Sequence, residues 1–158
     1  MATTTDILDP SLRTQPIYTR PLQGDEDFWR VRNLLLETVP LTPLDFNWDI
    51  RRWEGKRFYE ATPSQNGRLA GRVQLWLTQE ERLVGAVHPE GRGDAYLQIH
   101  PDFRALEPAM ITWAETHLAV PTADHAQPQL EIFVYDYDTA RQQVLQERGY
   151  TKMDDGGV

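Results

Sequence analysis

The sequence contains no cysteine in its 158 residues. This absence excludes disulfide bonds, thiolate metal sites and a cysteine nucleophile, and it fits a reducing compartment, so we expect a cytoplasmic protein. Long apolar runs are also missing, because none approaches the roughly 18 residues that a membrane-spanning helix needs. The first residues, Met1 to Asp6, form neither a basic nor an apolar signal region. We therefore expect neither secretion nor a membrane partner.

Positive charge is in short supply. Sixteen Lys and Arg residues face 24 Asp and Glu residues, which gives a net charge of −8. Such a chain repels phosphate backbones at long range, so nucleic-acid binding is disfavoured. The basic residues Arg51, Arg52, Lys56 and Arg57 are a local exception, and the acidic residues interleaved with them favour a solvated helix face.

Several catalytic motifs are absent as well. The sequence has no G-x-S-x-G, Walker A, G-x-G-x-x-G or H-E-x-x-H pattern, so hydrolase, NTPase, dinucleotide and zinc-protease interpretations lack support. His88 and His100 end adjacent predicted strands and could converge with Glu90 on a metal or a proton-transfer site. Histidines at strand ends more often cap turns, and we expect no metal.

The apolar pattern predicts one domain over residues 16–158, preceded by a flexible arm over residues 1–15. Period-2 alternation and helical spacing predict the order β-α-α-β-β-β-α-β-α. The expected strands are 17–22, 73–77, 83–87, 95–99 and 130–134, and the expected helices run from about 25 to 40, 45–61, 106–118 and 138–148. The fold class is therefore α+β, with a mixed, mainly antiparallel sheet flanked by helices in layers.

Burial follows from the same spacing. Alternation in strand 73–77 predicts that one face of this strand is buried. Separately, the sequence over residues 121–128 predicts a disordered linker. On helix 106–118, the spacing of Leu106, Met110, Trp113 and His117 predicts that these four side chains share the buried side.

The transition from strand 95–99 into helix 106–118 is the first place to look for function. A strand that leads into a helix N-terminus gathers backbone N–H groups and the positive end of the helix dipole at one point. An anionic ligand can bind there.

Three segments, together with the element order, carry a resemblance to a known family. They are Leu83-Val84-Gly85, Ile99-His100-Pro101-Asp102-Phe103-Arg104 and Leu145-Gln146-Glu147-Arg148-Gly149-Tyr150. The chain resembles the GNAT superfamily of acyl-CoA-dependent N-acetyltransferases over roughly residues 16–150. The family ends in a further β-hairpin, which is apparently missing here, so the chain resembles the first half of a tandem GNAT protein.

The resemblance implies acetyl-CoA as acyl donor. In the family, the strand matching 94–100 splays from the strand matching 129–135, the pantetheine arm pairs in the gap, and the following loop binds the pyrophosphate. The cofactor-binding residues implied here are Leu97, Ile99, Arg104, Ala105, Leu106, Glu107 and Ala109.

The implied phosphate loop departs from the family pattern Q/R-x-x-G-x-G/A. Arg104 and Ala109 match it, but Glu107 stands where the family has glycine, and Pro108 lacks a backbone donor. We expect weak phosphate binding for this reason. A second interpretation is that Glu107 simply stabilises the helix N-terminus.

The implied catalytic acid also differs. Leu145 occupies the position of the family's usual tyrosine, so an active enzyme would use another donor, such as Tyr135 or Tyr137. Glu90 or Asp94 could deprotonate the amine, although both also suit a solvated hairpin tip. The aromatic residues Phe46, Trp48, Trp53, Phe58 and Tyr59 form either core or an acceptor pocket.

Three hypotheses remain. The chain transfers an acetyl group to a small amine or a protein N-terminus; or it is a non-catalytic GNAT-like domain that supports a second, catalytic GNAT domain or binds a small ligand; or it is a homodimer that pairs through an open sheet edge.

Overall fold

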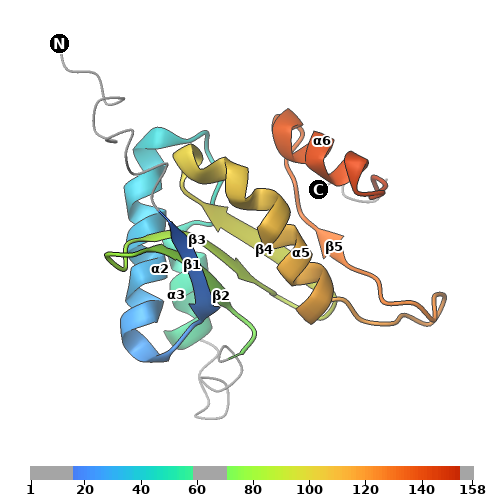
Figure 1. The fold of residues 1–158 in the computed structure, drawn as a ribbon, viewed down its shortest axis with the longest axis horizontal. Coiled ribbons are helices and arrows are strands. Elements are labelled where there is room, and N and C mark those ends of the chain that lie inside the picture. Colours follow the sequence, from blue (N-terminus) through green and yellow to red (C-terminus); the bar gives the residue numbers. More distant parts are fainter. Residues whose placement is uncertain (1–15, 59–70, 154–158) are drawn as a thin grey trace.

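The computed structural model describes residues 16–58 and 71–153 (Figure 1). The predicted arm over residues 1–15 lies outside the described residues, as do Tyr59 and the end of the helix predicted over 45–61. In the part that is described, no helix combines the length and the apolar character that crossing a membrane requires.

Five strands form one sheet in the order β1-β2-β3-β4-β5. The first four pair antiparallel, and β5 runs parallel to β4. The strands are β1 (Ile17–Pro21), β2 (Gln74–Thr78), β3 (Leu83–His88), β4 (Asp94–Ile99) and β5 (Glu131–Ile132). The predicted order of elements and the mainly antiparallel sheet are confirmed.

Helices cover both faces of this sheet (Figure 1). α2 (Gly24–Thr38) and α3 (Ile50–Phe58) lie on one face, and α5 (Glu107–His117) lies on the other. α6 (Thr139–Glu147) follows β5, and two short 3-10 helices, η2 (Val39–Leu41) and η3 (Pro101–Leu106), complete the described elements. The architecture is a layered, mixed α+β domain.

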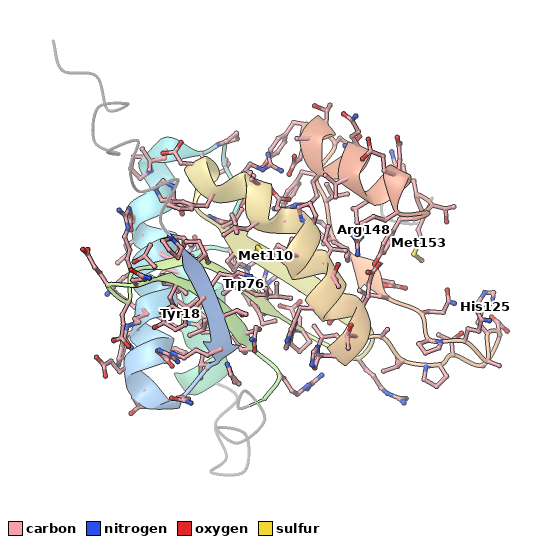
Figure 2. The ribbon with its side chains drawn as sticks, in the orientation of Figure 1. Tyr18, Trp76, Met110, His125, Arg148 and Met153 are labelled. Atoms are coloured by element: carbon pink, nitrogen blue, oxygen red, sulfur yellow. The ribbon has the colours of Figure 1, made fainter. Side chains whose placement is uncertain are left out.

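Strand β2 is buried on both faces, so the prediction of a single buried face is wrong. All five of its residues are buried. Leu75 and Leu77 pack toward α2, whereas Trp76 packs with Met110 on the side of α5 (Figure 2). The cause is the two-sided helical cover, which turns the apparently polar face of the strand into a second core.

A glycine in β3 lets α5 lie close to the sheet. A Cβ atom on Gly85 would lie 3.2 Å from Ile99 Cδ1 and 3.2 Å from Met110 Cε. Such contacts are tighter than ordinary van der Waals contact, so a larger residue here would force Met110 outward.

The buried face of α5 differs from the predicted one. Its buried stripe lies at i, i+3, i+4, i+7 and i+11, with Glu107, Met110, Ile111, Ala114 and Leu118. Trp113 is half-buried at the border of this stripe, where it meets Trp76 edge to face, and His117 is exposed. The predictions of a core Trp113 and a core His117 are therefore wrong.

The second helix begins later than predicted, at Ile50 instead of Asp45. Asp45 has a φ of 65°, in the left-handed region that a helix cannot contain. Residues 45–49 form a loop instead, and this loop closes one end of β4.

Residues 121–128 and the strand after them also differ from the prediction. A bridge between Val120 and Gln129 closes an exposed loop, which replaces the predicted disordered linker. The strand predicted over 130–134 is confined to Glu131–Ile132. α6 agrees with the prediction, since Asp138 accepts a hydrogen bond from the backbone N–H of Arg141 and caps the helix.

Candidate ligand site at the strand fork

β4 and β5 pair over only two register positions and then part. The pairs are Asp94 with Glu131 and Ala95 with Ile132. Beyond them, the described residues place no strand beside β4 on this side, so Leu97 and Ile99 lie at a fork (Figure 1). This fork is the splay that the resemblance implies.

A cavity of about 190 Å³ lies at the fork. It is bounded by the loop over residues 45–49, by β4, and by the segment that joins β5 to α6. Its walls include Trp48, Arg52, Tyr96, Leu97, Phe133, Tyr135 and Arg141. Phe46 and Trp48 from the predicted aromatic set line this cavity, whereas Trp53 is core and its ring stacks on Phe28.

The side chain of Asn47 occupies the open edge of β4 at Ile99. Its Oδ1 accepts the Ile99 N–H at 3.0 Å, and its Nδ2 donates to the Ile99 carbonyl oxygen at 2.9 Å. Next to it, the Trp48 N–H donates to Gln98 Oε1 at 2.8 Å. An amide side chain therefore takes both backbone groups that a strand-like ligand would use at Ile99.

A buried ion cluster joins the start of α5 to the start of α6. Arg104 Nε donates to Glu107 Oε2 at 2.5 Å, and Arg104 Nη2 donates to Asp138 Oδ1 at 2.7 Å. Arg141 Nε donates to the other oxygen of Glu107 at 2.6 Å. Glu107 and Asp138 are only 2% and 5% exposed. Two guanidinium groups thus face two carboxylates, and their charges balance.

This cluster determines what the predicted phosphate loop can do. The Glu107 carboxylate points into the protein, and the Glu107 N–H donates to the Arg104 carbonyl oxygen, so η3 runs directly into α5. Burial lowers the pKa of Arg104, but its hydrogen bonds with Glu107 and Asp138 outweigh burial, and the pKa lies above its ordinary value. Ala105 and Ala109 are exposed, and Leu106 is half-buried.

The two predicted carboxylate bases are engaged elsewhere. Glu90 receives two hydrogen bonds from Arg52, at 2.6 and 2.8 Å. Asp94 accepts the N–H groups of Glu90 and Gly91 at 2.9 Å each and so shapes the turn between β3 and β4. Neither side chain is among those that line the fork cavity. Their catalytic role stays a prediction.

The two predicted tyrosine acids lie side by side with their rings stacked, 5.5 Å between centroids. Tyr135 lines the fork cavity, and burial raises its pKa, with a further contribution from Asp45. The Tyr137 hydroxyl donates to the Leu44 carbonyl oxygen at 3.2 Å. Leu145, at the family's tyrosine position, is buried in the core. Of the four predicted catalytic residues, the described structure places Tyr135 on the cavity wall.

The histidines at the strand ends are part of the core. His88 Nδ1 lies 3.0 Å from the Pro89 carbonyl oxygen, and its Nε2 lies 3.0 Å from Gln98 Nε2. His100 Nδ1 accepts the Asp102 N–H at 3.2 Å. Within residues 16–58 and 71–153, no group of three or more His, Asp or Glu side chains could hold a metal ion.

No protein-family model matches the sequence, and no curated protein matches it. Several solved structures show a distant likeness. A tetramutant of BH1408 from Bacillus halodurans is 13% identical, with a TM-score of 0.41, over 87% of this chain and 94% of that chain. YycN from Bacillus subtilis, a proposed acetyltransferase, is 17% identical, with a TM-score of 0.40, over 88% of this chain and 94% of that chain. The fold assignment rests on the chain's own strand order and fork, which agree with a GNAT-like arrangement.

Sequence reasoning missed Asn47 and Arg141. Asn47 belongs to a segment predicted as helix, and its partner Ile99 is 52 residues away. Arg141 lies in the first turn of α6, where its spacing of three residues from Asp138 offered a weak indication of an ion pair.

Proposed function

We propose that this chain is a GNAT-like domain that binds a small ligand in the fork cavity and does not use acetyl-CoA as a substrate. The observation that carries the proposal is the position of Glu107, buried between Arg104 and Arg141. Arg104 lies in the loop that the resemblance implies for the pyrophosphate, and its side chain is already bound to two carboxylates of the chain itself.

An incoming pyrophosphate would have to compete with those carboxylates. A carboxylate about 4 Å from a phosphate charge repels it by roughly 4 kcal/mol at an effective dielectric constant near 20. Because this repulsion offsets the attraction of the paired guanidiniums, the cluster offers a pyrophosphate no net positive charge, and Pro108 offers no N–H to bind it. Asn47 opposes pantetheine pairing for a different reason, because its side chain already bonds the N–H and the carbonyl oxygen of Ile99.

Acetyl transfer to a small amine or a protein N-terminus is the second candidate. The observation that favours it is Tyr135 on the wall of the fork cavity. A tyrosine hydroxyl with its ordinary pKa of about 10 is already protonated at neutral pH, as a general acid requires, and burial raises the pKa of Tyr135 further.

Release of free CoA from acetyl-CoA distinguishes the two candidates. Because the sequence has no cysteine, a thiol reagent reports free CoA without background from the protein. With a mixture of small amines and peptide N-termini as acceptors, we expect no release above the rate without protein. Turnover that Tyr135→Phe abolishes and Tyr18→Phe preserves would instead establish the acetyltransferase.

Assembly with a second copy or with a catalytic domain stays a prediction. β5 is an edge strand of the sheet, and Phe133 just after it is 50% exposed. An exposed edge beside an apolar side chain is typical of a surface that pairs with another chain. Light scattering during size-exclusion chromatography would show a dimer, and a monomer at high concentration would exclude self-pairing.

A further inference from the structure

Arg141 is a buried cation whose hydrogen-bonding capacity is only partly used. Its side chain is 5% exposed. Its Nε donates to Glu107, but its Nη2 is buried without a hydrogen-bond partner. Leaving a buried donor unpaired is costly, so such a group indicates a place for an acceptor. Because Arg141 forms part of the fork cavity wall, a bound molecule can supply that acceptor.

Other parts of the cavity wall are aromatic and flat. Phe133 stacks on Tyr96 with 6.1 Å between ring centroids and 25° between planes. Tyr135 meets Phe133 edge to face at 5.1 Å. Such surfaces favour a planar apolar body. At about 190 Å³ the cavity suits a single ring with a small substituent, since a cavity of about 150 Å³ can hold benzene.

The charges around the cavity disfavour the binding of an anion. The carboxylates of Asp45, Asp49, Glu90, Glu107 and Asp138 outnumber the guanidiniums of Arg51, Arg52, Arg104 and Arg141 by one. A carboxylate ligand would add a second uncompensated negative charge in a partly desolvated site, whereas a neutral oxygen adds none. An amine ligand would meet Arg52, whose guanidinium already lies 4.1 Å from the Trp48 ring centroid.

We propose that the fork cavity binds a small uncharged carbonyl compound with a flat apolar body, such as an aromatic amide. Its carbonyl oxygen accepts a hydrogen bond from the Nη edge of Arg141, and its ring packs among Tyr96, Phe133 and Tyr135. This assignment rests on the proposed function, because it requires the fork to be free of acetyl-CoA.

Benzamide and benzoate form a matched pair of probes, since they have nearly the same shape and differ in charge. Each is titrated into the ¹⁵N-labelled full-length chain, and amide and arginine side-chain spectra are recorded. We expect benzamide to shift the Arg141 Nε–H signal and the backbone signals of Tyr96, Leu97 and Tyr135 in a saturable manner. Benzoate should bind at least tenfold more weakly.

Two variants show whether the cavity is the binding site. Phe133→Ala removes a half-exposed ring from the wall, so the chain should still fold and benzamide affinity should fall about fivefold or more. Tyr18→Ala, on β1 at the opposite end of the sheet, should leave affinity unchanged (Figure 2).

Three results would overturn the assignment. Benzoate binding as tightly as benzamide refutes the uncharged ligand, and equal effects of the two variants refute the location. The absence of saturable shifts up to the solubility limit of benzamide refutes the ligand class. Low-micromolar binding of acetyl-CoA in the same spectra would instead refute the proposed function, so the two failures are distinguishable.

Discussion

At the scale of single residues, Glu107 determines the charge and the hydrogen bonding of the predicted phosphate loop. It is accommodated at 2% exposure because Arg104 and Arg141 each bind one of its oxygens and because it begins α5, where the helix dipole favours an anion. A buried ion pair adds little net stability compared with apolar residues, but removing one partner leaves an uncompensated charge. Glu107 is therefore difficult to replace.

Glu107→Gln should lower the free energy of unfolding by about 3–5 kcal/mol, because it leaves the buried Arg141 and the half-buried Arg104 facing one carboxylate. Urea denaturation measures the loss, and added phosphate should restore part of it by binding at the vacated charge. Glu54→Gln, in a half-exposed pair with Arg32, is the control and should cost less than about 1 kcal/mol. Similar small losses for both variants would show that the cluster does not hold α5 and α6 together.

The sequence alone indicates that positions 107 and 145 are unusual, because both depart from the family pattern. It does not reveal where the side chains point. Asp138 reaches Arg104 across 34 residues, and Asn47 reaches Ile99 across 52. Contacts at such separations depend on how the helices dock on the sheet, which composition and periodicity do not encode.

At the scale of elements, α5 shows why a helix is easier to predict than its buried face. The apolar residues fit a stripe through Leu106, Met110 and Trp113 about as well as the observed stripe through Met110, Ile111 and Ala114. The observed stripe also buries Glu107, which an apolar pattern would exclude. Arg141 from α6, together with Arg104 from η3, makes that burial possible.

Two tryptophans provide a test of which face of α5 is buried. Trp53→Ala should cost about 3–5 kcal/mol, because the side chain is fully buried, stacks on Phe28 and donates from Nε1 to the Phe28 carbonyl oxygen at 3.0 Å. Trp113→Ala should cost clearly less, because this ring is half-buried. Chemical denaturation of both variants decides the order, and a larger loss for Trp113 would show that the face of α5 is misplaced.

The junction of β1 and α2 depends on a buried carboxylate. Burial alone would raise the pKa of Asp27, but hydrogen bonds from Arg20, the Gln23 N–H and Arg30 outweigh it, so the pKa is lowered. A lowered folded-state pKa adds stability above the unfolded value of about 3.9, and this stability is lost as the pH falls below it.

We therefore expect the free energy of unfolding to fall as the pH drops from about 5 toward 2, where Asp27 takes up a proton on unfolding. The measurement is urea denaturation across this range. Asp27→Asn should be less stable at neutral pH and should show a shallower acid-side slope than wild type. An unchanged slope in the variant would exclude Asp27 as a source of acid sensitivity.

At the scale of the whole molecule, the order of elements is predictable because each strand and helix has its own local pattern. Turns such as Gln79-Glu80-Glu81, where Glu81 has a φ of 64°, mark the end of one strand and the start of the next through their own residues. The fork is different, since it follows from the family resemblance and not from any period in the sequence. Its two-residue pairing could not be predicted from the longer alternation over residues 130–134.

A calorimetric titration of the full-length protein with acetyl-CoA tests the central claim most directly, which is that carboxylates of the chain itself bind the Arg104 side chain in the loop implied for the pyrophosphate. The account predicts a dissociation constant weaker than about 100 µM, corresponding to less than about 5.5 kcal/mol of binding free energy. A dissociation constant in the low micromolar range for the wild-type chain would contradict it.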